Sequence, residues 1–97
     1  MGRKSIIVIE HAWDRIRKRG TNLSEIKKVL NKGEKVEARY PRKAKEMIFL
    51  YNKKWQNKYY PEKKVRVIYT EGEEELTVIT VYVYFGKWEE KNENNLW

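Results

Sequence analysis

The fold is decided near the start of the chain by the stretch SIIVIEHAWDRIRKRG, residues 5–20. Its first five residues are dense in β-branched side chains and do not alternate with polar ones, which predicts a strand covered on both faces. The residues that follow place Ala12 and Ile16 four apart with Trp13 beside them, and this spacing predicts a helix over residues 11–19 with one apolar side. Gly20 is expected to end that helix as a left-handed cap.

The same helix carries a stripe of polar groups. His11, Arg15 and Arg19 are spaced four residues apart, so they share one side of the helix, and all three can donate hydrogen bonds to phosphate. The stripe therefore predicts an anion-binding surface. The alternatives are that it faces water, that the arginines pair with carboxylates such as Glu10, and that His11 has an ordinary packing role.

A second helix is expected to begin at Asn22 or Ser24 and to end at Gly33. Glu25 follows Asn22 by three residues, as in a capping box. The apolar residues that fall on one face of this helix are Leu23, Ile26, Val29 and Leu30. With the short turn between them, the two helices form an αα-hairpin, which is also how a helix-turn-helix looks from sequence alone.

From Lys35 onward the apolar residues recur with a period of two. The predicted strands cover residues 36–40, 47–52, 65–70 and 76–85. Residues 42–55 also fit a helix, but the run IFLY at 48–51 favours a strand. The polar, glycine-containing sequence EGEE at 71–74 predicts that the last two strands form an antiparallel hairpin. The expected fold class is α+β, with an N-terminal strand and an αα-hairpin packed on a twisted, mainly antiparallel sheet.

Composition and charge narrow the function. The 97 residues include 22 Lys and Arg against 14 Asp and Glu, a net charge of +8, which favours nucleic acid or an acidic protein as partner. Lys- and Glu-rich surfaces also occur in heat-adapted proteins without a binding role. The chain has no cysteine, which favours a cytoplasmic location, and no apolar run long enough for a membrane helix.

A single domain is expected over residues 1–88, followed by a polar tail at 89–97. Trp88, Leu96 and Trp97 interrupt the polar character of this end of the chain. We expect them to dock either on the domain's own sheet or on a second copy of the chain in a homodimer.

Residue types exclude several kinds of active site. With one histidine and no cysteine, the chain has neither a cysteine nucleophile nor a histidine metal cage, and no glycine-rich phosphate loop is present. No metal or other cofactor is expected. The remaining chemistry is RNA cleavage by the RNA's own 2′-hydroxyl, which requires only a base, an acid and cationic groups from the protein.

The last two strands supply candidates for such a site. Alternation places Thr80, Tyr82 and Tyr84 on one face of the last strand. The opposite, core-facing set is predicted to be Ile79, Val81, Val83 and Phe85. Lys64 and Arg66 of the partner strand are expected beside the tyrosines, where they would form a cationic, aromatic patch. The alternative is an ordinary solvated sheet face, because tyrosine and threonine are common strand residues. Arg39, Arg42 and Lys43 flank Pro41 in a predicted loop that could clamp phosphates.

The motif HAxxRxxxRG at 11–20 and the run VITVY at 78–82 resemble a family of small uncharacterised bacterial and archaeal proteins. That family is similar in architecture to the RelE/ParE toxin superfamily, including BrnT-type toxins. The resemblance implies an αα-hairpin on a twisted antiparallel sheet and, depending on the branch, cleavage of messenger RNA in the ribosome or poisoning of gyrase. The family motif carries over only His11, Arg15, Arg19 and Thr80.

These observations predict a toxin-like, metal-independent endoribonuclease of a toxin-antitoxin pair. Its expected partners are RNA, free or ribosome-bound, and an acidic antitoxin. The predicted catalytic residues are His11, Arg66 and Tyr82. The predicted RNA-binding residues are Arg15, Arg19, Arg42, Lys43, Lys64, Thr80 and Tyr84. The alternatives are a non-catalytic module that binds nucleic acid or an antitoxin, and a gyrase-poisoning toxin.

Overall fold

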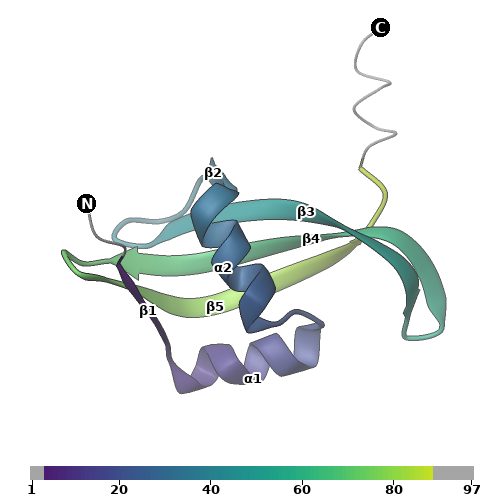
Figure 1. Ribbon diagram of the computed structural model, residues 1–97, viewed down its shortest axis with the longest axis horizontal. Helices are drawn as coiled ribbons and strands as arrows, with labels where there is room; N and C mark the ends of the chain where they lie inside the picture. Colours follow the sequence, from purple (N-terminus) through teal and green to yellow (C-terminus); the bar gives the residue numbers. More distant parts are fainter. Residues whose placement is uncertain (1–3, 89–97) are drawn as a thin grey trace, which may run out of the picture.

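The computed structural model describes residues 4–88, which fold into two helices and a five-stranded mixed sheet (Figure 1). The α+β class expected from the sequence is confirmed. In chain order the elements are β1 (Ser5–Val8), α1 (Glu10–Arg19), α2 (Leu23–Lys32), β2 (Glu34–Val36), β3 (Lys43–Trp55), β4 (Lys58–Glu71) and β5 (Glu75–Gly86).

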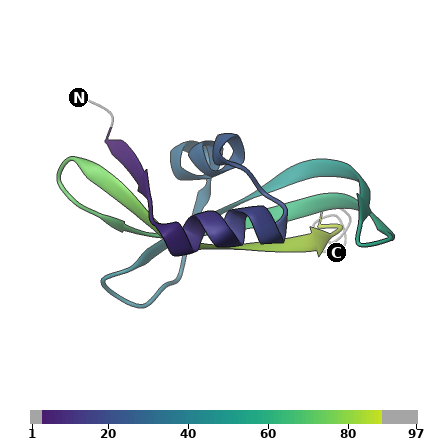
Figure 2. The ribbon, with the colours of Figure 1, turned by 90° about the horizontal axis from the view of Figure 1, so that it is seen from below.

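The sheet has the strand order β1-β5-β4-β3-β2. β1 is therefore an edge strand with exposed alternate residues, and the expectation that it is covered on both faces is wrong. β1 runs parallel to β5, with Ser5 opposite Glu75 and Val8 opposite Val78, whereas the other neighbouring strands are antiparallel. Beyond Val78, α1 lies alongside β5, and α2 crosses one face of the sheet (Figures 1 and 2). The opposite face of the sheet carries neither helix.

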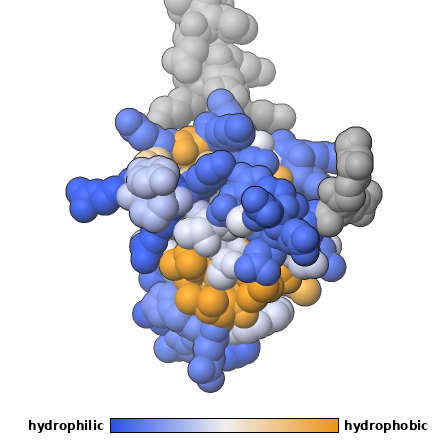
Figure 3. Space-filling model, turned by 90° about the vertical axis from the view of Figure 1, so that its left-hand side faces the viewer, coloured by the Kyte–Doolittle hydropathy of each residue, from blue (hydrophilic) through white to orange (hydrophobic). Residues whose placement is uncertain are grey.

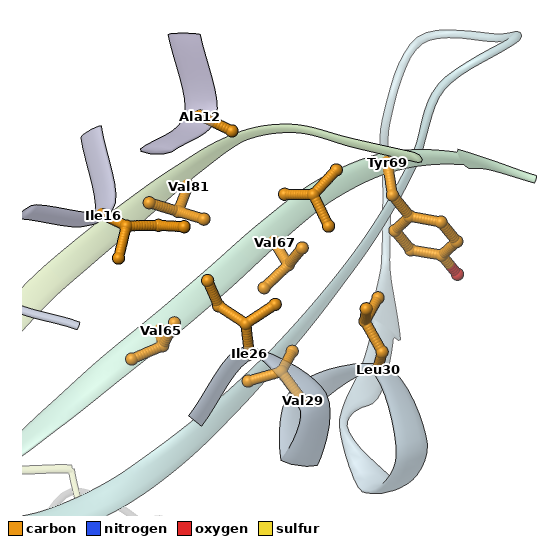
Figure 4. Packing of buried hydrophobic residues seen from close by; sticks show 10 residues of the cluster. Ala12, Ile16, Ile26, Val29, Leu30, Val65, Val67, Tyr69 and Val81 are labelled. Atoms are coloured by element: carbon orange, nitrogen blue, oxygen red, sulfur yellow. The ribbon is translucent and has the colours of Figure 1, made fainter. Parts of the chain in front are cut away.

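The core lies between the helices and the sheet. Figure 4 shows its side chains, which are Ala12, Ile16, Ile26, Val29, Leu30, Val65, Val67, Tyr69, Val78 and Val81. Alternate residues of β4 enter this cluster, as a period of two requires. Fully burying a Val, Leu or Ile side chain stabilises a fold by about 1.5–3 kcal/mol, so this small cluster is the main source of stability.

Local signals at the helix ends act as predicted. Gly20 has φ 88° and its N–H donates to the carbonyl of Ile16, a left-handed cap for α1. Asn22 caps α2, because its side-chain oxygen accepts a 2.9 Å hydrogen bond from the N–H of Glu25. The three residues between the helices therefore make the tight turn of the αα-hairpin.

The strand boundaries correct one expectation and confirm another. The predicted strand at 36–40 is wrong except for its first residue, because β2 ends at Val36. The chain then turns, with the N–H of Arg42 donating to the carbonyl of Arg39, and Pro41 has no N–H for a sheet ladder. The ambiguous residues 42–55 form a strand, as favoured, and β3 begins at Lys43 and runs to Trp55.

A bulge in β5 changes which residues face the core. Ile68 lies opposite Thr80 and Tyr69 lies opposite Val78, so Ile79 is an extra residue between the two pairs. Val78 and Val81 are fully buried, whereas Ile79 is not in the core cluster. The prediction that Ile79 faces the core together with Val81 is therefore wrong.

The end of the described chain packs on the sheet. The backbone N–H of Trp88 donates to Glu62 at 2.5 Å, and the Lys64 ammonium lies 5.0 Å from the centroid of the Trp88 ring. Of the expected docking residues, Leu96 and Trp97 lie outside the described residues, as does the predicted tail at 89–97. Among residues 4–88, neither helix combines the length and the apolar character required to span a membrane.

Candidate functional site

Helix α1 holds the predicted polar stripe in place by burying its other side. Ala12 and Ile16 are almost completely buried against the sheet. The N–H of Ile9, just before the helix, donates to the carbonyl of Val78 and ties the start of α1 to β5. His11 and Arg15, which follow one turn apart, are left on the side of α1 that is turned away from the core.

This stripe borders a hollow of about 430 Å³, which we call the α1–β5 hollow. It is lined by Ile9, His11, Arg15 and Arg19 from the start of the chain, by Arg42, and by Ile79, Thr80 and Tyr82 of β5. Four of these groups carry or can carry positive charge, and the isoleucines supply an apolar wall. The hollow has the size of a ligand pocket and the charge to hold a phosphate.

Arg19 joins the helix to the strand at this hollow. Its Nη1 donates a 2.7 Å hydrogen bond to the carbonyl of Val81, and its Cζ lies 5.0 Å from the centroid of the Tyr82 ring. The first contact satisfies a carbonyl on the edge of β5, and the second is a cation–π stack. Since a guanidinium has five N–H donors, Arg19 retains donors for an anion in the hollow.

Arg15 is positioned by a carboxylate. Its Nη1 lies 2.5 Å from Oδ2 of Asp14, and the same oxygen lies 3.3 Å from the Lys18 ammonium. Desolvation alone would raise the pKa of Asp14, but the hydrogen bond from Lys18 and the charges of Lys18, Arg15 and Arg17 hold that pKa below its ordinary value. The carboxylate that pairs with Arg15 is thus Asp14 rather than Glu10.

The helix-free face of the sheet continues from the hollow. Tyr82 lies opposite Arg66 in the ladder, and Tyr84 lies opposite Lys64. The Arg66 guanidinium is 5.3 Å from the Tyr84 ring centroid, so the predicted cationic, aromatic patch forms. Lys64, Arg66 and Tyr84 thus lie near Tyr82, but they do not line the α1–β5 hollow.

Glu46 partly neutralises this patch. Arg66 donates to its Oε1 through Nε at 2.9 Å and through Nη2 at 2.8 Å, and Lys64 lies 3.8 Å from Oε2. Glu46 is not among the site residues predicted from the sequence. The signal that would find it is the ladder register, which pairs Glu46 with Arg66 across β3 and β4.

Lys43 lies apart from the candidate site. Its ammonium is 2.8 Å from Glu71, and Lys4 contacts the other oxygen of the same carboxylate at 2.7 Å. Hydrogen bonds from Lys4 and then Lys43 lower the pKa of Glu71 to about 2. This ion-pair cluster joins the start of β3, the end of β4 and the residue before β1.

A larger hollow, of about 610 Å³, lies on the helix side of the sheet. Its lining residues are Lys4, Ser5, Ile6, Lys27, Leu30, Asn31, Lys35, Lys45, Tyr69, Glu71 and Leu76. Figure 3 shows hydrophobic surface surrounded by hydrophilic side chains at the end of the molecule where β1 lies, and Ile7 of β1 is 42% exposed. Its described lining includes neither histidine nor arginine, its cationic groups are lysines, and one of them, Lys4, is already paired with Glu71.

Comparison with known proteins identifies the domain family. Residues 8–83, from the end of β1 into β5, match the model of the domain of unknown function DUF4258. Because the match covers most of the chain, the protein belongs to this family. All residues that line the α1–β5 hollow fall inside the matched segment. The searches of the curated proteins and of the solved structures found no match to this chain.

Proposed function

We propose that this protein is a toxin-like, metal-independent endoribonuclease of a toxin-antitoxin pair, with an architecture of the RelE/ParE type. The observation that carries the proposal is the convergence of groups distant in sequence on one hollow. His11 and the arginines of α1, Arg42 of the β2–β3 loop, and Tyr82 of β5 all line it. A base, a phenol and several cations are the groups that cleavage of RNA by its 2′-hydroxyl requires.

In this proposal the α1–β5 hollow holds the scissile phosphate. His11 accepts the proton of the 2′-hydroxyl as that oxygen forms its bond to phosphorus. The bond from phosphorus to the 5′-oxygen breaks, and the Tyr82 hydroxyl donates a proton to the departing oxygen. The products are a 2′,3′-cyclic phosphate and a free 5′-hydroxyl, so atoms and charge balance without a co-reactant.

The arginines stabilise the additional negative charge of the phosphorane. Arg19 is fixed at the rim by Val81 and Tyr82, so its N–H groups are oriented before the substrate arrives. Arg15 and Arg42 complete the cationic lining. Arg66 was expected from the sequence to be catalytic, but it does not line the hollow and Glu46 holds it beside Tyr84. In this proposal it therefore contacts a flanking nucleotide instead of the reacting phosphate.

The experiment is incubation of the purified protein with RNA in EDTA, with and without ribosomes. We expect fragments that end in 2′,3′-cyclic phosphate. Lys28→Ala serves as the control, because Lys28 is exposed on α2 and does not line the hollow. This variant should cleave RNA like the unaltered protein. Intact RNA in both conditions would contradict the nuclease.

A non-catalytic binding module is the second candidate. It is favoured by the ion pairs of Arg15 with Asp14 and of Arg66 with Glu46, which show that this surface already accommodates carboxylates. Such a module would bind an acidic antitoxin or nucleic acid through the same cationic surface without cleaving. Binding of RNA in EDTA without any cleavage would favour it.

A further inference from the structure

A second, smaller hollow borders the first. It has a volume of about 260 Å³, and we call it the arm hollow. Its lining residues are Lys18, Arg19, Trp55, Gln56, Tyr82, Val83, Tyr84 and Phe85. Arg19 and Tyr82 line both hollows, so the stacked Arg19–Tyr82 pair forms a wall common to the two.

The far wall of the arm hollow comes from the hairpin of β3 and β4, which curls beyond the end of β5 (Figures 1 and 2). A register shift between Leu50 and Lys53 marks the bend. At the tip, Gln56 and Asn57 both have positive φ angles, 52° and 71°, as a two-residue type I′ turn requires. This turn brings Gln56 to the rim of the hollow.

Trp55 is held rigidly in that wall. Its ring stacks on Phe85 with centroids 4.9 Å apart and an interplanar angle of 14°. The ring centroids of Tyr51 and Tyr60 lie 5.2 Å and 5.5 Å from that of Phe85, so the four rings form one aromatic cluster. Trp55 is partly exposed and lines the arm hollow, so its ring is pre-organised to stack with a ligand there.

The chemistry of the arm hollow matches an unpaired nucleotide. Tyr82 and Tyr84 are 40% and 42% exposed and offer aromatic surface, while Gln56 supplies an amide that can pair with a base edge. Lys18 and Arg19 supply positive charge for the backbone. Thr80 and Tyr84 are separated by about 13 Å along β5, so a phosphate in one hollow and a neighbouring base in the other fit one short strand.

We propose that the arm hollow is a base-binding subsite for an unpaired nucleotide adjacent to the phosphate in the α1–β5 hollow. The inference rests on the proposed function and deepens it, because it makes single-stranded RNA the substrate class. The base stacks against Trp55 and Tyr84, and Arg19 carries the phosphate between the two hollows. A base-paired nucleotide cannot enter, because its faces are covered by its neighbours in the duplex.

The test measures binding separately from cleavage. A fluorescent eight-nucleotide 2′-O-methyl RNA has no free 2′-hydroxyl and cannot be cleaved by the proposed chemistry. Its affinity in EDTA, measured by anisotropy, is compared with that of the same oligomer carrying abasic sites at its four central positions. We expect the intact oligomer to bind at least about fivefold more tightly, the lower end of the range for one stacked base.

Variants locate the subsite. Trp55→Leu should abolish the preference for the intact oligomer, and Tyr84→Leu, an exposed change that keeps the fold, should reduce it. Tyr59→Leu is the matched control, because Tyr59 is an exposed aromatic residue of the same hairpin that lines neither hollow. The preference should persist in that variant, and the unaltered protein should bind a duplex of the same length more weakly than the single strand.

Three results would overturn the subsite: equal binding of the intact and abasic oligomers, an unchanged preference in both Trp55→Leu and Tyr84→Leu, or binding of an oligoglutamate peptide in place of any oligonucleotide. Cleavage of natural RNA is scored in a parallel reaction. A preference for the intact oligomer without cleavage would contradict the proposed nuclease and support the subsite. Cleavage without such a preference would contradict the subsite alone.

Discussion

Arg19 shows how one side chain can organise a site. Its guanidinium is hydrogen-bonded to the Val81 carbonyl and stacked on Tyr82, so the orientation of the side chain is fixed before a ligand binds. Fixing a guanidinium in advance reduces the entropy lost when an anion binds. A lysine at this position would keep the charge but lose the planar stack and the fork of donors.

Under the proposed nuclease function, replacement of His11 separates catalysis from binding. We expect His11→Asn to slow RNA cleavage by about 100-fold or more, because general-base catalysis contributes roughly that factor. Binding of uncleavable 2′-O-methyl RNA should change by less than about twofold. Since His11 lies on the exposed side of α1, the variant should fold normally, as circular dichroism can check. Cleavage at the unaltered rate would exclude His11 as the base.

At the scale of elements, Gly20 joins the end of α1 to the curled hairpin. Its φ of 88° suits glycine, and a Cβ there would lie 3.0 Å from the Trp55 ring. Gly20→Ala is therefore expected to lower the free energy of unfolding by about 1–2 kcal/mol. Urea denaturation followed by tryptophan fluorescence measures this loss.

Gly72→Ala is the matched control for that prediction. Gly72 lies in the β4–β5 turn, and a Cβ added there would meet Glu75 at 3.6 Å, an ordinary contact. The free energy of unfolding of the Gly72→Ala variant should stay within about 0.5 kcal/mol of that of the unaltered protein. Equal stability losses in the two variants would show that neither the positive φ nor the Trp55 contact matters.

The ion pairs of Glu71 link the start of β3, the end of β4 and the residue before β1, and they give a pH-dependent contribution to stability. The folded protein lowers the pKa of Glu71 to about 2, through hydrogen bonds from Lys4 and then Lys43. A carboxylate with a lowered pKa contributes fully above its unfolded pKa, near 4.5, and its contribution is lost as the pH falls toward 2.

Glu71→Gln should therefore reduce the free energy of unfolding at pH 7 by about 0.5–1 kcal/mol, a value limited by the exposure of these side chains. The difference between the variant and the unaltered protein should shrink below pH 4.5 and vanish near pH 2. Urea titrations at pH 7, 4 and 2 measure it, with Glu73→Gln in the same turn as the control. A difference independent of pH would rule out the ion pairs as its cause.

The elements differ in how much of them could be predicted from the sequence. The ends of α1 and α2 could, because Gly20 and Asn22 act through contacts with their immediate neighbours. The bulge at Ile79 could not, because alternation continues through VITVYVY and only pairing with β4 shows where a residue is skipped. The early end of β2 at Val36 could not be predicted either, because the expected strand over residues 36–40 ended just before Pro41 and so did not conflict with that proline.

The candidate site was predictable only where it depends on local sequence patterns. The stripe of α1 and the face of β5 each follow from local periodicity, so His11, Arg19 and Tyr82 could be proposed. That they share one hollow with Arg42 depends on the strand order, which no local pattern contains. Likewise, Trp55 reaches the end of α1 only because its hairpin bends.

At the scale of the whole molecule, the net charge of +8 predicts a steep dependence of RNA binding on salt. If Arg15, Arg19 and Arg42 each contact one phosphate, the logarithm of the affinity should fall with the logarithm of the salt concentration with a slope of about −2. Arg42→Gln should reduce the slope by about 0.7, and Lys28→Gln should leave it unchanged. A slope near zero would contradict phosphate recognition by this surface.

The pairing of the first strand with the last has a consequence for biosynthesis. Residues 5–8 find their partners at 75–78, and Arg19 bonds to a carbonyl 62 positions later. A nascent chain that has emerged only as far as β4 therefore carries all of α1 but neither Tyr82 nor the neighbouring wall of the hollow. If the domain harms RNA, the harm begins only once translation of its final strand is complete, and prematurely terminated products are innocuous to the cell that makes them.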